Sequence, residues 1–384
     1  MSKLTKILCA SLCLCAICLN SACSSDEKGN DNKTNSGKTN QEQTLDTNGD
    51  EQNSEFTPSD EVITLPSYDN EANSYINPLT GLKSTKDIAE KRPVAIMINN
   101  LKESLPQEGI SNADIVYEIL EEGGITRLMC IYNDYKDIPK IGSIRSTRDY
   151  FIDISDIHDS ILVHVGGSTY AKNVIESRKT HNIDGIIYED IYFERDEERL
   201  ETMSLEHTMV ITGKKLDKAI SEIGYRNSAI TKQPLNFASE EVPIEGKTAR
   251  KISFPFSIGR TNNPYAVSFF NYDEQSGNYL KGHFGTAHVD GANNRQLAFK
   301  NVITLTVDMR PIPGDELGCL KMNFTGIGTG TYSCGGVMKD IVWTRDSKTS
   351  SYVLYENDGV TPLTLNPGKS YIAIVPLGTK ITAE

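Results

Sequence analysis

The hydrophobic pattern divides the chain into three regions. Apolar residues fill positions 7–19, nearly vanish between positions 24 and 76, and then return as short runs. An apolar run of that length is typical of a secretory signal and too short for a stable membrane span. The polar region buries too little apolar surface to offset the entropy of ordering. The pattern predicts a signal at residues 1–22, a disordered tether at 23–76 and a folded part from residue 77.

Within residues 77–230, strand patterns alternate with helix patterns. Continuous apolar runs predict strands at residues 94–98, 115–120, 126–132 and 159–165. Ser146 and Asp149 have the spacing of a capping box and predict a helix that begins there. Further helices are predicted at residues 172–179 and 214–223. This alternation predicts a layered α/β domain.

Residues 231–384 change to short alternating runs separated by turn residues. Strands are predicted at residues 266–272, 279–284, 302–307, 336–344, 352–355 and 371–375. Glycines at 326, 328 and 330 predict a flexible hairpin, because no strand–helix unit surrounds them as a phosphate loop requires. The second region is therefore predicted to be β-rich, and the whole chain to have an α+β fold.

Most of the negative charge lies in the predicted tether. Residues 24–76 contain twelve acidic residues and three lysines, which gives −9. The chain carries −13 and the signal contributes two lysines, so residues 77–384 carry −6. An acidic body disfavours nucleic acid as a partner. Three cysteines, Cys130, Cys319 and Cys334, lie in the predicted folded part. Two alternatives stay open: a disulfide between Cys319 and Cys334, or free buried thiols.

The end of the signal predicts the location of the protein. Lys3 and Lys6 precede the apolar run, and Ser21-Ala22 precede Cys23. Cleavage before Cys23 would let its thiol carry a lipid anchor at the extracytoplasmic face of the cell membrane. Asn20 occupies a position where an aliphatic residue is usual, so an ordinary cleaved signal is the alternative. The polar sequence that follows Cys23 favours lipidation.

Three arginines form the best candidate binding site. Arg145 and Arg148 flank a predicted helix start, where free backbone N–H groups favour an anion. Arg127 follows a Gly-Gly turn that would bring it to the same place. Guanidinium groups make bidentate contacts with phosphate or carboxylate. The alternative is structural, with the arginines paired to Glu118, Glu121 or Glu122.

Candidates for catalysis are His164, His207 and Asp149. His164 ends a predicted strand, where open α/β sheets bind ligands, and His207 follows a glutamate. Together with Asp149 they would form acid–base machinery, although a strand-end histidine is commonly a hydrogen-bonded structural residue. No zinc spacing is present. His283, His288 and Asp290 are the remaining candidate metal ligands, and His288 and Asp290 share one strand face. Three ligands on one short hairpin give little support for a metal, so we expect neither metal nor cofactor.

A set of motifs adds a resemblance that covers residues 77–376. The motifs begin at Asn77-Pro78-Leu79-Thr80-Gly81-Leu82, Arg92-Pro93-Val94, Gly109-Ile110-Ser111-Asn112, Gly123-Gly124-Ile125-Thr126-Arg127, Gly142-Ser143-Ile144-Arg145-Ser146-Thr147-Arg148 and His164-Val165-Gly166-Gly167-Ser168, and continue at His288-Val289-Asp290, Gly328-Thr329-Gly330, Trp343 and Asn366-Pro367-Gly368. In this order they resemble the YerB-like lipoproteins, a bacterial family of two consecutive domains of unknown function. The resemblance implies a membrane-anchored envelope protein and no particular activity. This chain has Asn99-Asn100 where the resemblance implies Asp-Asn, so a carboxylate role there is not carried over.

Three functional hypotheses remain from the sequence. The favoured one is a lipoprotein, without catalysis, that binds an anionic cell-wall component or a protein partner. The second is an enzyme that acts on a phosphate-bearing envelope substrate through Arg127, Arg145 and Arg148. The third, a solute-binding lipoprotein, is disfavoured because such proteins have two similar lobes, whereas the two halves of this chain differ.

Overall fold

The computed structural model of the chain describes residues 75–230, 232–258 and 267–384. The predicted signal, Cys23 and nearly all of the predicted tether lie outside the described residues. Strands dominate, and among the described residues no α-helix lies beyond residue 223. The structure is thus mostly sheet, and the predicted α+β class fits it only loosely. None of the helices in the described part of the chain is long and apolar enough to cross a membrane.

The elements of the first half alternate as predicted. Its helices are α1 (Lys86–Ala89), α2 (Asp149–Ile157), α3 (Thr169–Arg178), α4 (Glu197–Thr202) and α5 (Gly213–Ile223), with 3-10 turns η1 (Lys102–Ser104), η2 (Ile110–Asn112), η3 (Glu122–Gly124) and η4 (Leu205–His207). Its strands are β1 (Tyr75–Ile76), β2 (Lys83–Ser84), β3 (Val94–Asn99), β4 (Ile115–Leu120), β5 (Thr126–Tyr132), β6 (Ile141–Gly142), β7 (Ile161–His164), β8 (Asn182–Asp184), β9 (Glu194–Arg195) and β10 (Met209–Ile211).

The second half consists of strands. They are β11 (Lys247–Thr248), β12 (Lys251–Pro255), β13 (Val267–Asp273), β14 (Asn278–His283), β15 (Thr286–Ala287), β16 (Ala298–Phe299), β17 (Asn301–Pro311), β18 (Leu320–Asn323), β19 (Gly326–Cys334), β20 (Val337–Arg345), β21 (Val353–Glu356), β22 (Ser370–Pro376) and β23 (Thr382–Ala383). All six strand regions predicted in this half are present, within a few residues of their expected bounds.

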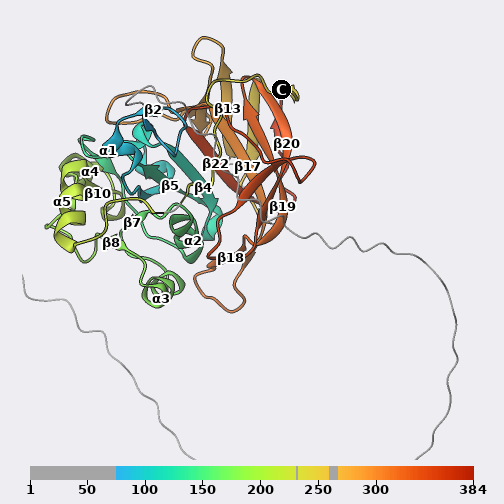
Figure 1. The fold of residues 1–384 in the computed structure, drawn as a ribbon. Helices are drawn as coiled ribbons and strands as arrows, with labels where there is room; N and C mark the ends of the chain where they lie inside the picture. Colours follow the sequence, from blue (N-terminus) through green and yellow to red (C-terminus); the bar gives the residue numbers. More distant parts are fainter. Residues whose placement is uncertain (1–74, 231, 259–266) are drawn as a thin grey trace, which may run out of the picture. The chain divides into compact units, whose positions relative to one another are not determined.

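One large sheet joins the two halves. Among the described residues it has twelve strands, in the order β11-β20-β19-β17-β22-β4-β5-β3-β7-β8, with β18 beside β17 and β21 beside β20. Strand β22 pairs in parallel with both β17 and β4 (Figure 1). Contacts group the described residues into one compact unit. The division into regions 77–230 and 231–384 stays a prediction, but the two regions share a continuous sheet.

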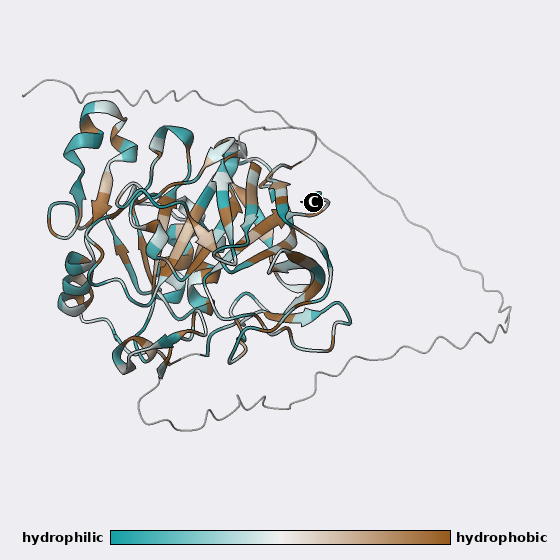
Figure 2. Ribbon diagram, turned by 90° about the horizontal axis from the view of Figure 1, so that it is seen from above, coloured by the Kyte–Doolittle hydropathy of each residue, from teal (hydrophilic) through white to brown (hydrophobic). Residues whose placement is uncertain are grey.

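A second sheet, in the order β15-β14-β13-β12-β23 with β16 beside β14, packs on one face of the large sheet. Phe270 on β13 and Phe299 on β16 both lie edge-on against Tyr371 of β22, with ring centroids 5.0 Å apart in each case. Aromatic pairs in this geometry add to the stabilisation that their buried area provides. Apolar segments gather on the central strands, whereas the outer helices and loops are mainly polar (Figure 2).

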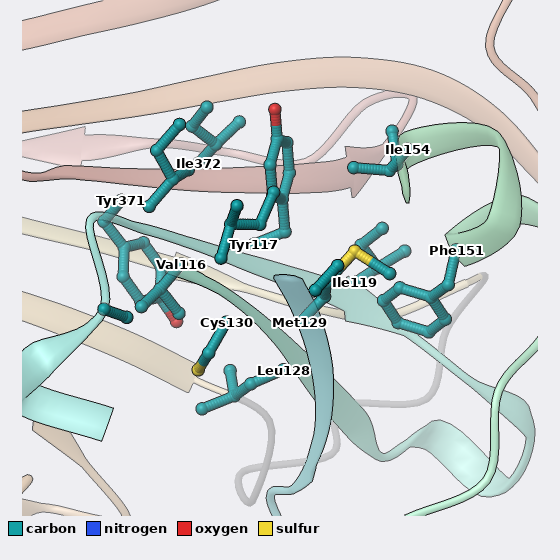
Figure 3. Packing of buried hydrophobic residues seen from close by; sticks show 14 of the residues in the cluster. Val116, Tyr117, Ile119, Leu128, Met129, Cys130, Phe151, Ile154, Tyr371 and Ile372 are labelled. Carbon is teal, nitrogen blue, oxygen red and sulfur yellow. The ribbon is translucent and has the colours of Figure 1, made fainter. Parts of the chain in front are cut away.

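Strands β4 and β5 bury different partners on their two faces, because successive side chains of a strand point to opposite sides. Ile119 and Met129 lie near Phe151 of α2, whereas Val116 lies on the side of Tyr371 (Figure 3). All five side chains are fully buried. With both faces covered, these strands read as continuous apolar runs in the sequence.

Two local predictions are wrong. Helix α2 begins at Asp149 with Arg148 as its N-cap and no side-chain cap, so Ser146 does not form the predicted capping box. The glycine-rich run is part of strand β19, which pairs along its length with β20. A Cβ at Gly328 would lie 2.4 Å from the indole of Trp343. The glycine therefore lets this buried tryptophan lie across the strand and does not mark a flexible hairpin.

The buried His158 links the two halves through hydrogen bonds. Its Nε2 lies 2.8 Å from the Tyr117 hydroxyl, its Nδ1 lies 2.6 Å from Gln233 Oε1, and Tyr117 in turn contacts Tyr352 at 2.7 Å. Burial lowers the pKa of His158 from 6.5 to about 4, against the opposing hydrogen bond to Gln233. The folded protein therefore holds this imidazole neutral where the unfolded chain would protonate it.

We predict that part of the acid sensitivity of the fold comes from His158. Between pH 6.5 and pH 4 the unfolded state binds the proton and the folded state does not, so stability falls as the pH falls through this window. His158→Gln removes this titration. The variant should lose less free energy of unfolding than the wild type between pH 6.5 and pH 4, by at most roughly 3 kcal/mol. Urea unfolding at several pH values measures it. Equal slopes in the two proteins would contradict the prediction, whatever their absolute stabilities.

Candidate functional site

The three candidate arginines come together at the ends of strands β4 and β5. Arg127, at the start of β5, places its Nη2 2.7 Å from Glu121 Oε2, and both side chains are buried. Its Nη1 also donates to the backbone carbonyl of Ser146 at 2.8 Å. Arg148 donates from Nε to Glu122 Oε2 at 3.0 Å, and its Nη2 lies 3.7 Å from Glu121. Two of the three arginines, Arg127 and Arg148, are therefore paired with Glu121 and Glu122, as the structural alternative predicted.

Arg145 differs from the other two arginines in its partner. Its guanidinium contacts Glu206, whose side chain is 45% exposed, while that of Arg145 is 26% exposed. Glu206 is the one hydrogen-bond partner of this guanidinium among the described residues. The Nε atoms of Arg127 and Arg145 are buried and have no acceptor in the described part of the chain. The cluster therefore combines buried donors that have no acceptor among the described residues with one carboxylate that is exposed at the surface.

Burial sets the electrostatics of the cluster. It raises the pKa of Glu121, and the positive charges of Arg127, Arg148 and Arg145 oppose this rise without cancelling it. For Glu122, burial also raises the pKa, but the hydrogen bond and charge of Arg148 outweigh it and the pKa is lowered. The fully enclosed carboxylate is thus the one whose charge costs most, and it is the one nearest to Arg127.

His207 is the one candidate histidine that lies beside this cluster. Its Nδ1 is 2.8 Å from the side-chain nitrogen of Asn99, and its Nε2 is 3.7 Å from Glu206. Burial lowers the pKa of His207, Glu206 opposes this, and Arg145 adds to it. A neutral imidazole therefore stands next to Arg145, with one nitrogen held by Asn99.

His164 and Asp149 have structural surroundings. His164 is 2% exposed, with Nδ1 2.7 Å from the Gly166 carbonyl and Nε2 3.1 Å from Asn182 Oδ1. Burial raises the pKa of Asp149, and the charged groups that act on it most are Lys348 and Asp153. Among the described residues, no side-chain hydrogen bond or ion pair joins either residue to the arginines, although Asp149 directly follows Arg148 in the chain. Their catalytic role is not supported by these surroundings.

A buried charge network on the other face of β4 and β5 was not predicted. Glu118 is fully buried, and its Oε1 accepts from Asn100 at 3.1 Å and from Thr126 at 2.7 Å. Its Oε2 accepts from the hydroxyls of Ser268 and Tyr371. The sequence signal was a glutamate inside an otherwise apolar strand.

The positive partner of this network is Lys281 on β14, which is fully buried. Its Nζ donates to the Ser268 hydroxyl at 3.1 Å, and that hydroxyl donates to Glu118, so the serine bridges the two charges. Burial lowers the pKa of Lys281 to about 8, against the attraction of Glu118. For Glu118, burial raises the pKa, but Lys281 and the surrounding donors outweigh it and the pKa is lowered.

His288 and Asp290 also have partners that differ from metal ligands. Nε2 of His288 lies 2.7 Å from Gln107 Oε1. Both carboxylate oxygens of Asp290 accept backbone N–H groups, from Gly109 at 3.0 Å and from Ser111 at 2.7 Å. No group of three His, Cys, Asp or Glu side chains in the described part of the chain is arranged to hold a metal ion. The two residues fasten the β-rich half to the segment before β4.

The described cysteines are free thiols. Cys130, Cys319 and Cys334 are all buried and unbridged. Burial raises the pKa of Cys130 to about 12 and that of Cys319 to about 11. A thiol with a raised pKa is a poor nucleophile, so neither cysteine has the surroundings of a reactive one.

A pocket of about 370 Å³ has two residues of the Glu118 network in its lining. We call it the strand-end pocket. It is lined by residues that follow β3, residues around the start of β5, and one residue of the β14–β15 turn: Asn100, Leu101, Lys102, Glu103, Gly124, Ile125, Thr126 and Phe284. Asn100 and Thr126 belong to the Glu118 network, whereas their chain neighbours Asn99 and Arg127 face the arginine cluster.

The chain is similar to proteins of one family along most of its length. Residues 79–226 match the domain described as "Protein of unknown function (DUF3048) N-terminal domain", and residues 257–372 match the DUF3048 C-terminal domain. A Bacillus subtilis (strain 168) protein described as "Putative lipoprotein YerB" is 29% identical over 300 residues, which cover 78% of this chain and 86% of that protein. The crystal structure of YerB protein from Bacillus subtilis superposes with a TM-score of 0.69 at 28% identity, over 80% of this chain and 99% of the other.

We predict that the Glu118 network controls stability. Lys281→Met leaves the Glu118 carboxylate buried without its counter-charge and should lower the free energy of unfolding by about 3–5 kcal/mol. Adding Glu118→Gln should recover part of this loss, because the second change removes the uncompensated charge. Urea unfolding measures each variant.

The matched control is Lys339→Met, since Lys339 pairs with Glu356 at 2.6 Å near the surface, with side chains 20% and 31% exposed. It should cost at most about 1 kcal/mol. A Lys281→Met loss no larger than that of the control would show that the buried pair is not what holds the two sheets together.

Proposed function

Because the chain belongs to the DUF3048 family of YerB-like lipoproteins, we propose that it is a lipid-anchored extracytoplasmic protein that binds an anionic, phosphate-bearing component of the cell envelope. The ligand site is the cluster of Arg127, Arg145 and Arg148. The observation that carries this proposal is the pairing of Arg145 with the exposed carboxylate of Glu206, beside the buried ion pairs of Arg127 and Arg148.

The anchor follows from the N-terminal sequence. Lys3, Lys6 and the apolar run have the order of a secretory signal, and the small residues Ser21 and Ala22 precede Cys23. One fatty-acyl chain such as palmitate holds a protein at a membrane only weakly, so stable anchoring needs more than one chain. The tether predicted from the polar composition of residues 23–76 would leave the folded part free to contact the cell wall.

The three arginines divide the work of binding. Arg127 and Arg148 are held by Glu121 and Glu122, so they form a rigid, charge-paired floor. Arg145 exchanges the exposed Glu206 for the ligand. A dianionic phosphate competes well with one carboxylate, because it carries more charge and offers more acceptor oxygens to the guanidinium fork of Arg145.

We expect phosphate binding to depend on Arg145. One charge-assisted pair is worth about 1.5–3 kcal/mol, so Arg145→Ala should weaken the binding of glycerol phosphate by roughly 10- to 100-fold. Glu206→Gln should strengthen it, because the variant removes the competing carboxylate. Isothermal titration calorimetry at fixed salt measures both, since ionic screening changes such affinities.

The matched control is Arg178→Ala. Arg178 is 24% exposed and pairs with Asp153 and Asp156, both at 2.8 Å, so its loss tests a similar ion pair away from the cluster. If Glu206→Gln and Arg145→Ala change only the melting temperature, the arginines are structural and the proposal fails. Turnover of the probe would favour the enzymatic alternative, for which His207 beside Arg145 is the available base.

The anchor gives a separate prediction. Cys23→Ala removes the thiol that would carry the lipid, so the protein should be released from the membrane fraction or accumulate with its signal attached. Fractionation and mass spectrometry of the N-terminus measure this, with Cys18→Ala as the matched control inside the signal. A Cys23→Ala protein that is processed normally and stays membrane-bound would exclude lipidation at this residue.

A further inference from the structure

The strand-end pocket has an aromatic wall that the hairpin holds in place. Phe284 and Gly285 form the two-residue turn between β14 and β15, where His283 pairs with Thr286. Both turn residues have positive φ, 49° and 78°, as a primed hairpin turn requires. Such a φ is uncommon for a bulky side chain. The turn leaves the Phe284 ring half-buried on the pocket, with its centroid 3.8 Å from that of His283.

The floor of the pocket has little hydrogen-bonding capacity left for a ligand. The Asn100 amide donates to Glu118 and to Thr126, and its oxygen accepts from Gln107 at 3.1 Å. Thr126 donates to Glu118 at 2.7 Å. These contacts fix the floor and engage its polar atoms inside the protein.

Hydrogen-bonding groups that remain for a ligand lie at the rim. The side chains of Lys102 and Glu103 are exposed and have no hydrogen bond or ion pair with other described residues. Leu101 and Ile125 complete the half-buried apolar wall with Phe284. A cavity of about 370 Å³ with an aromatic wall and a polar rim has the size and lining of a small-molecule site.

This combination suits a sugar ring. The C–H face of a pyranose is apolar and packs flat on an aromatic ring, while its hydroxyls point outward. Those hydroxyls both donate and accept, so one ring can use the Lys102 ammonium and the Glu103 carboxylate at once. A purely aliphatic ligand would leave both rim charges unused.

The pocket borders the arginine cluster. Glu103 at its rim is close enough to His207 to act on the charge of that ring. His207 lies 3.7 Å from Glu206, which is the partner of Arg145. Thr126 on the floor is followed directly by Arg127, whose side chain points to the other face of the sheet. A ligand that crosses the strand ends would meet both sites.

We propose that the strand-end pocket holds the sugar ring of a sugar phosphate whose phosphate group binds at Arg145. This inference rests on the proposed function and adds the chemical class of the ligand. The phosphate supplies the charge-dependent part of the affinity, and the sugar supplies selectivity through Phe284 and the rim.

Calorimetry on the full chain with two probes, inorganic phosphate and N-acetylglucosamine 1-phosphate, tests the proposal. The sugar phosphate should bind at least about tenfold more tightly than phosphate, since burial of an apolar ring face adds to the charge-assisted contacts. Phe284→Asn should remove that difference and leave phosphate binding unchanged. Asparagine tolerates positive φ, so the turn is kept.

Lys102→Ala gives a second test at an exposed position, with Lys247→Ala, exposed on β11, as the matched control. Lys102→Ala should weaken the binding of the sugar phosphate severalfold and leave the binding of inorganic phosphate unchanged. If wild type binds both probes equally, or if Phe284→Asn and Lys102→Ala leave the difference intact, the pocket is not a sugar site while the proposed function stands. If neither probe binds, the proposed function fails and this inference fails with it.

Discussion

The structure depends on how one buried carboxylate is neutralised. Glu118 lies in the middle of an apolar strand, and its charge is tolerable there only because four side-chain donors and Lys281 surround it. Two of those donors, Ser268 and Tyr371, and the lysine itself come from the second half of the chain. The same set of contacts therefore solvates the charge and fixes the second sheet on the first. A two-region sequence is in this way tied into one sheet system.

Strand alternation explains why the Glu118 network and the arginine cluster lie so close together. Neighbouring residues such as Thr126 and Arg127 point to opposite faces, so one serves the Glu118 network and the other the arginine cluster. The face that carries Glu118 holds its two buried charges, Glu118 and Lys281, in fixed hydrogen bonds. The face that opens toward Glu206 leaves one pair exposed. Rigid support on one side and an exchangeable partner on the other are the features that a preorganised anion site needs.

The strands and helices of the described part were largely predictable from the sequence. The sequence also predicted that Arg127, Arg145 and Arg148 lie near one another. The apolar runs of β3, β4 and β5 are long and continuous because both faces of the sheet are covered, which makes them easy to recognise. The predicted capping box is wrong, although Ser146 and Asp149 have the spacing of one. Helix α2 begins at Asp149 and has Arg148 as its N-cap. The interpretation of Gly328 as a flexible position was wrong. A glycine is needed there because a side chain would clash with the indole of Trp343, which lies on the neighbouring strand fifteen residues later in the sequence.

The sequence by itself determined the family and most strand positions, and it predicts the secretory signal and the tether, since these depend on composition and on periodicity within a few residues. Only the tertiary structure decided the partners of charged side chains. It placed Lys281 opposite Glu118, 163 positions apart, and gave Arg127 and Arg148 to Glu121 and Glu122 while leaving Arg145 with the exposed Glu206. The physical reason is that the cost of a charge depends on burial and on neighbours brought in from distant strands, and neither is encoded in local spacing.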